Sequence, residues 1–257
     1  MKWIAFLISI TFFSFNAFSS EEIGHWLINY YKNPNPDDFV IEVKKLSKEG
    51  ILGDPKHKQN VAVFLSQVLA ANPSKTSEWL KKLHSLNKTD MEPVFYAVWL
   101  SDTQESKEYL KSIGAKEALK TKPTNFLEIE IDNPSTLDAL WSYFFASGKA
   151  APIRKIISAL NYANYDGSIE AYKTSEKTEE DKRKAILESV FKAALWSLES
   201  NIKQHPKIGE ISGTIINDKT LTNNERLWLG VALSNALPKK YKMVNAKPGE
   251  WRLETYK

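Results

Sequence analysis

The chain has 257 residues, of which 42% are hydrophobic and 26% are charged, a composition typical of globular proteins. Its net charge of +4 is too balanced to indicate a nucleic-acid-binding protein. There is no cysteine, which excludes disulfides, thiol catalysis and lipid attachment through a thiol. The fold must therefore be stabilised by packing alone.

Residues 1–19 have the three parts of a secretory signal peptide. Lys2 precedes an apolar run from Trp3 to Phe15, and Ala17-Phe18-Ser19 follows, with small residues on either side of Phe18. The alternative is a membrane anchor, which needs about 20 apolar residues, but Asn16 interrupts this run. We therefore expect cleavage near Ser19 and an exported protein, periplasmic or secreted, with no transmembrane span in the mature chain.

Between residues 20 and 237 the strongest signal is an apolar set at positions i, i+3, i+4, i+7 and i+8, which places five side chains on one face of an α-helix. The set recurs in five segments, at residues 23–31, 61–69, 91–99, 137–145 and 187–195. Each is followed by a turn and a shorter apolar helical pattern, in residues 39–46, 79–83, 109–113, 153–160 and 208–215.

A further helix is predicted over residues 223–237. The sets recur at unequal steps of 30 to 50 residues, within the range of helical-hairpin repeats but without a fixed period. The sequence therefore predicts an all-α protein, an irregular α-solenoid-like array of about five antiparallel helix pairs plus a C-terminal helix. We expect residues 20–237 to form one domain.

Turn residues support these boundaries. Asn35-Pro36 and Asn72-Pro73 pair a helix-capping side chain with a proline at the first helical position. Gly50, Gly114 and Gly148 fall just past predicted helix ends, where a left-handed backbone is needed.

Two segments interrupt the helical pattern. Residues 126–132 alternate like a strand, but a lone strand has no partner, so we expect an extended connector. Residues 166–177 are polar and rich in turn formers, and we expect a mobile connector there. Thr178 to Asp181 then resembles a capping box that starts a helix reaching about Gln204.

Signals for catalysis are weak. None of the four histidines has metal-ligand spacing to another ligand, and no serine nucleophile or phosphate-binding glycine motif is present. His205 precedes Pro206, and we expect it to contact the last carbonyls of the preceding helix. Paired carboxylates are frequent, for example Glu128 and Glu130, and two of them could meet in space as in a glycan hydrolase. We predict no catalytic residue, no metal and no cofactor.

The aromatic residues, which make up 12% of the chain, could serve as stacking surfaces for sugars or peptides. Most of the tryptophans fall on or beside the apolar stripes, so we expect a core position for Trp26, Trp79, Trp99, Trp141 and Trp196.

The C-terminal residues 238–257 hold six basic and two acidic side chains and are predicted to be a flexible basic tail. Cations alternate with aromatic residues there, a composition that suits an anionic lipid headgroup, wall polymer or acidic protein, although short basic tails are often only solvated. The candidate binding residues are Lys239, Lys240, Tyr241, Lys242, Trp251 and Arg252.

Several segments, above all residues 137–160, resemble a group of uncharacterised bacterial exported proteins. The other segments are residues 64–73, 196–198 and 204–206. The resemblance implies a bacterial and periplasmic setting. It rests on packing motifs and transfers no catalytic residue.

Taken alone, the sequence favours a binding or scaffold protein, because stacked helix pairs present an extended concave surface. Its partner would be a protein or an envelope component, and its oligomeric state is open. The alternative is an enzyme that acts on a cell-envelope polymer through paired carboxylates. A third hypothesis is recruitment to an anionic membrane through residues 238–257.

Overall fold

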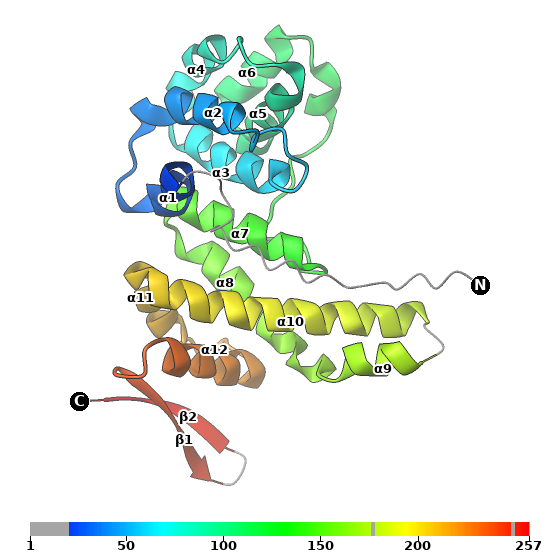
Figure 1. Ribbon diagram of the computed structural model, residues 1–257, viewed down its shortest axis with the longest axis vertical. Coiled ribbons are helices and arrows are strands. Elements are labelled where there is room, and N and C mark those ends of the chain that lie inside the picture. The colour runs from blue at the N-terminus through cyan, green and yellow to red at the C-terminus, as the bar shows by residue number, and fades with distance from the viewer. Residues whose placement is uncertain (1–20, 176–177, 248–249, 257) are drawn as a thin grey trace.

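The computed structural model describes residues 21–175, 178–247 and 250–256 (Figure 1). The predicted signal peptide, residues 1–19, lies outside the described residues. Within them, α-helices dominate and the sheet has two strands, so the all-α prediction is confirmed. No helix in this part of the chain is long and apolar enough to cross a bilayer.

Twelve α-helices follow one another in the described residues. The first six are α1 (Glu21–Asn29), α2 (Phe39–Lys48), α3 (Lys58–Ala71), α4 (Thr76–Lys82), α5 (Lys88–Ser101) and α6 (Gln104–Ser112). The other six are α7 (Pro134–Ser147), α8 (Ala150–Ser158), α9 (Ser168–Thr174), α10 (Glu179–Gln204), α11 (Pro206–Ile215) and α12 (Asn223–Ala236). Short 3₁₀ segments are η2 (Tyr30–Lys32), η3 (Pro36–Asp38), η4 (Pro73–Lys75), η5 (Lys116–Lys120) and η6 (Ala159–Tyr165).

Helix ends largely follow the predicted chemistry. The side chain of Asn35 accepts a hydrogen bond from the backbone N–H of Asp37, and that of Thr178 caps α10. Asn72 differs, because its side-chain amide donates to the carbonyl of Val68 and does not cap η4. The predicted left-handed glycines have positive φ, at Gly50, Gly114 and Gly148.

The helices stack in an order that differs from their order in the sequence. Helix α3 packs against both α5 and α7, α7 packs against α10, and α10 packs against α12. Figure 1 shows α7 between the group formed by α2 to α6 and the group formed by α8 to α12. Helix α7 therefore joins the two halves of the core.

Aromatic side chains fill this junction. Phe144 is fully buried, and its ring centroid lies 4.9 Å from that of Tyr31 and 5.7 Å from that of Phe145. The ring of Trp141 stacks on Phe145 at 6.0 Å. These contacts tie η2 to α7.

The tryptophan prediction is correct for four of the five residues named. Trp79 and Trp141 are buried, and Trp26 and Trp99 pack against the core while partly exposed. The prediction is wrong for Trp196, whose residue surface is 44% exposed on α10.

The two predicted connectors have different outcomes. Residues 126–132 form a turn and extended chain without a strand, held by the buried side chains of Phe126 and Ile131. In the second connector, whose residues 176–177 lie outside the described residues, helix α9 forms, and the buried carboxylate of Glu188 accepts the backbone N–H of Ile169 at 2.6 Å. A carboxylate at this position stabilises the start of a helix.

Residues 238–257 were predicted to be a flexible tail, but an antiparallel hairpin of β1 (Tyr241–Lys247) and β2 (Glu250–Thr255) forms there. The hairpin packs on α12, where Gly230 lies so close to Met243 and Leu253 that any larger residue would collide with the Met243 sulfur. The segment is therefore part of the folded structure.

Candidate functional site

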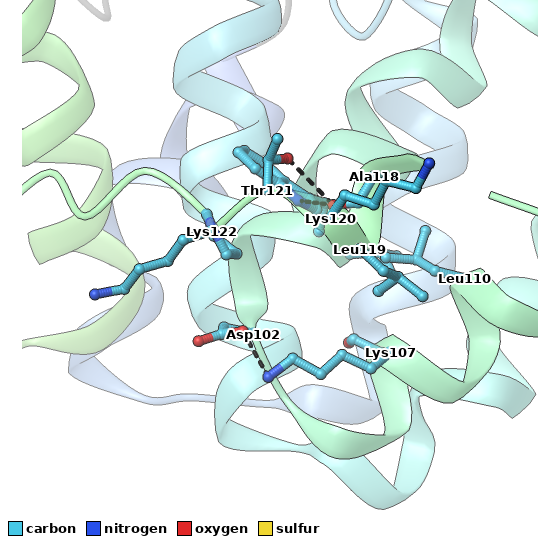
Figure 2. Close-up of a pocket in the computed structure, with 12 residues that line it drawn as sticks. Asp102, Lys107, Leu110, Ala118, Leu119, Lys120, Thr121 and Lys122 are labelled. Carbon is cyan, nitrogen blue, oxygen red and sulfur yellow. Dashed lines mark hydrogen bonds and ion pairs between the residues drawn. The ribbon is translucent and has the colours of Figure 1, made fainter. Parts of the chain in front are cut away.

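A cavity of about 340 Å³ lies between α5, α6 and η5 (Figure 2). We call it the α5–α6 pocket. Its lining residues are Val98, Trp99, Asp102, Ser106, Lys107, Leu110, Ala118, Leu119, Lys120, Thr121, Lys122 and Pro123.

A tight turn between α5 and α6 shapes one side of the pocket. Asp102 ends α5 with a φ of 52°, the one positive φ among the described non-glycine residues. Thr103 then caps α6 by accepting the backbone N–H of Ser106. The reversal lets the Asp102 carboxylate bind the Lys107 ammonium at 2.8 Å. Strained backbone of this kind costs about 1 kcal/mol and persists where the surroundings hold it.

A fixed tryptophan forms the opposite side. The indole N–H of Trp99 donates to the carbonyl of Ala118 at 2.8 Å, and its ring stacks on Tyr96 at 5.6 Å. The same carbonyl accepts the hydroxyl of Thr121 at 3.3 Å. Figure 2 shows the Asp102–Lys107 pair on one side and residues 118–121 on the other. The indole therefore fastens η5 onto α5 and keeps the pocket open.

The interior is apolar. Val98 and Leu110 are buried in the core beneath the pocket, and Leu119 is partly buried beside them. The two side-chain hydroxyls of the lining are already used, because Ser106 bonds to Ser101 and Thr121 donates to the Ala118 carbonyl. The floor of the pocket is therefore hydrocarbon and indole, whereas Asp102 and three lysines line the rest of it.

Three lysines surround this interior. Lys107 is paired with Asp102, and Lys120 is paired with Glu117 at 2.6 Å. Lys122 has no ion-pair partner among the described residues. Figure 2 shows the Lys122 side chain extending away from the other two lysines. Lys122 thus adds a positive charge beside the pocket that no described carboxylate balances.

The chain matches no family model, no curated protein and no solved structure. The chemistry of the pocket therefore has to be inferred from its own residues. It holds no histidine, and its single carboxylate is in an ion pair, so no base lies beside a free nucleophile. The arrangement is suited to binding.

The C-terminal residues predicted to bind an anionic surface do not form one site. Tyr241 is buried, and its hydroxyl lies against Gly213 of α11. Trp251 and Arg252 are adjacent in β2, so their side chains point to opposite faces of the hairpin. Trp251 is half exposed, and Arg252 pairs with Glu254 at 2.8 Å.

The remaining predicted lysines are exposed and separate. Lys242 lies on the same face as Arg252 and also contacts Glu254, at 3.5 Å. Lys239 and Lys240 precede the first strand, and the Lys240 ammonium lies 5.2 Å from the Tyr241 ring centroid. Glu254 therefore offsets part of the positive charge that binding to an anionic surface would need.

Carboxylates elsewhere bind separate basic residues. Asp37 binds Lys75, and Glu130 binds Arg183 at 3.2 Å. Within residues 21–175, 178–247 and 250–256, no three histidine, aspartate or glutamate side chains are grouped to hold a metal ion.

His205 was expected to contact the last carbonyls of α10, but its ring bonds to Tyr31 instead. It is buried, its Nδ1 lies 3.0 Å from the Tyr31 hydroxyl, and its ring centroid is 5.1 Å from that of Phe145. Burial, helped by the nearby charge of Lys32, lowers the pKa of His205 from 6.5 to about 4. The imidazole therefore joins η2 to the start of α11 as a neutral group.

The buried, neutral His205 makes a contribution to stability that depends on pH. The unfolded chain takes up a proton at His205 below pH 6.5, whereas the folded chain does so only near the pKa of about 4. The contribution of His205 to the free energy of unfolding therefore falls by about 2 kcal/mol between pH 7 and pH 5. The free energy of unfolding of His205→Gln, measured with urea at both pH values, should lack this contribution. The control Tyr31→Phe should retain it, because burial is the main cause of the shift. If the free energy of unfolding changes equally between pH 7 and pH 5 in His205→Gln and in the wild type, the low pKa of His205 is contradicted.

Proposed function

We propose that the chain is an exported binding or scaffold protein and that the α5–α6 pocket is its ligand-binding site. The observation that carries this proposal is the apolar pocket held open by the Trp99–Ala118 hydrogen bond. Binding sites of this kind are concave, mostly apolar and largely preformed. Export is supported by the signal-peptide pattern of residues 1–19, and a periplasmic setting is the one that best accommodates it.

The surrounding helices suit a scaffold. Pairs of helices packed side by side, in the manner of an irregular solenoid, are rigid platforms that position binding surfaces. Here α3 and α6 both pack against α5, and the Trp99–Ala118 hydrogen bond joins η5 to it. The pocket consequently sits on rigid elements, which favours recognition.

The pocket can be tested with a variant that fills it. Leu119 lines the cavity and is only partly buried, so Leu119→Trp should occupy the space without emptying the core. We expect the immobilised wild-type chain to retain a component of the source cell's envelope fraction, and Leu119→Trp to retain about tenfold less of it or none. Lys111→Gln, an exposed change on α6 outside the lining, should retain as much as the wild type.

Two outcomes would contradict the proposal. Equal retention by Leu119→Trp, with an unchanged thermal midpoint, would remove the pocket from the binding surface. Release of soluble fragments from purified wall polymer by the wild type, lost in a carboxylate variant such as Glu130→Gln, would favour the enzyme hypothesis.

A further inference from the structure

The size of the α5–α6 pocket limits what can enter it. A volume of about 340 Å³ is at the lower end of the range for ligand sites. It accommodates an aromatic ring together with a short aliphatic chain, because an apolar cavity of about 150 Å³ already holds benzene, and it is too small for a folded partner's surface. The occupant is therefore a single small group, either free or at the end of a larger molecule.

The lining also excludes most polar groups. A neutral sugar needs several hydrogen-bond partners, because burying an unpaired hydroxyl is unfavourable. The hydroxyls of Ser106 and Thr121 are engaged within the protein, and the Trp99 N–H is bonded to Ala118. These side chains have no free N–H or O–H to donate, so the part of the ligand that lies on Trp99 and Leu119 is apolar.

The charges around the pocket define the other end of the ligand. Asp102 balances Lys107 and Glu117 balances Lys120, which leaves the charge of Lys122 for a ligand. The Lys107 ammonium is held at the wall by Asp102 and has further N–H groups to donate. The flexible four-carbon stem of Lys122 allows its ammonium to approach a ligand at the opening. One unbalanced charge matches a monoanion better than a doubly charged phosphate ester.

We infer that the α5–α6 pocket binds an apolar group that bears one carboxylate. The hydrocarbon or ring lies on Trp99 and Leu119. The carboxylate lies at the opening, and the exposed, flexible Lys122 side chain turns towards it from the position shown in Figure 2. This inference rests on the proposed binding function and specifies its ligand chemistry. The same chemistry occurs in a free carboxylic acid and in the last residue of a protein that ends in an apolar side chain.

Calorimetric titration of the full chain with four probes tests the inference. The probes are hexanoate, hexanamide, the peptide Ala-Ala-Ala-Leu as a free acid, and the same peptide as a C-terminal amide. We expect binding of at least one of the acids, and binding about tenfold weaker for its neutral amide. Hexanoate binding identifies a free acid as sufficient, whereas binding by the peptide acid alone identifies a protein terminus.

Variants connect the binding to the named residues. Lys122→Gln should weaken binding of the acid about fivefold, and Leu119→Trp should abolish it. Lys111→Gln, which removes an equal charge from α6 outside the pocket, should leave the affinity unchanged.

Three results would overturn the inference. These are equal affinities for an acid and its amide, an affinity unaffected by Lys122→Gln, and no binding by any of the four probes. Each leaves the proposed function standing if retention of the envelope component still depends on Leu119, so the two proposals can fail separately.

Discussion

Phe144→Ala is expected to destabilise the protein by about 3 to 5 kcal/mol, because it opens a cavity in the core beside α7, the helix that joins its two halves. Phe144 is 0% exposed, and its ring lies against Tyr31 of η2 as well as Trp141 and Phe145 of α7. A loss of this size should lower the thermal midpoint of the full chain by about 10 °C, measured by circular dichroism.

The matched control is an aromatic residue at the surface. Trp251 is 50% exposed on the hairpin, and Trp251→Ala should change the free energy of unfolding by less than about 0.5 kcal/mol. If Phe144→Ala leaves the midpoint unchanged, or lowers it no more than Trp251→Ala does, then α7 is not the centre of the core.

Asp138→Asn is expected to stabilise the protein at alkaline pH. Asp138 lies on α7, is partly buried, and has no hydrogen-bond or ion-pair partner among the described residues. Burial raises the pKa of its carboxyl group from 3.8 to about 7. Above pH 7 the folded chain must therefore hold an ionised carboxylate at a site that is largely shielded from water.

The sign of the effect follows from the two pKa values. Between pH 3.8 and pH 7 the folded chain binds a proton at Asp138 that the unfolded chain lacks, so stability falls as pH rises. The whole difference corresponds to up to about 4 kcal/mol. Asp138→Asn should be more stable than the wild type by up to this amount at pH 8, and nearly equal to it at pH 4.

Urea unfolding at both pH values checks this prediction. Glu128→Gln, an exposed carboxylate-to-amide change on the connector before α7, should alter stability by less than about 0.5 kcal/mol. A pH-independent difference between Asp138→Asn and the wild type would contradict the assigned pKa.

As the pH changes, Asp138 and His205 alter the stability of the wild type in opposite directions. As pH falls from 6.5 towards 4, protonation of Asp138 stabilises the folded chain while the proton excluded from His205 destabilises it. These two contributions largely cancel in the wild type. The single variants are therefore needed to reveal either one.

The helices could be predicted because each carries its own periodic pattern. The stripe at residues 137–145 became α7, and the capping signal at Thr178 begins α10 as expected. Helix α9 was missed because its stability depends on a distant side chain, the Glu188 carboxylate. A local sequence pattern cannot show such a contact.

The hairpin was not predicted because its alternating apolar residues lie among many charged residues. Tyr241, Met243 and Leu253 share the face that packs against helices, but lysine and arginine between them gave the segment the composition of a solvated tail. The Pro-Gly pair between the strands was the available turn signal.

The pocket could not be found in the sequence. Trp99 belongs to an apolar stripe and was correctly expected to pack against the core, yet one side of its ring lines the cavity. The other walls come from α6 and η5, and only the folded chain brings Leu110 and Leu119 together. The lysines of these segments have the pattern of ordinary solvent-exposed lysines, so they gave no sign of a pocket.

A ligand in the α5–α6 pocket lies beside Trp99, so nuclear magnetic resonance of the chain labelled with ¹⁵N-tryptophan can detect its binding there. The Trp99 indole signal, assigned through Trp99→Phe, should shift as the envelope fraction or hexanoate is added. The signals of buried Trp79 and Trp141 should stay in place. A Trp99 signal that does not move while the ligand is retained, or equal movement of all three, would contradict the account.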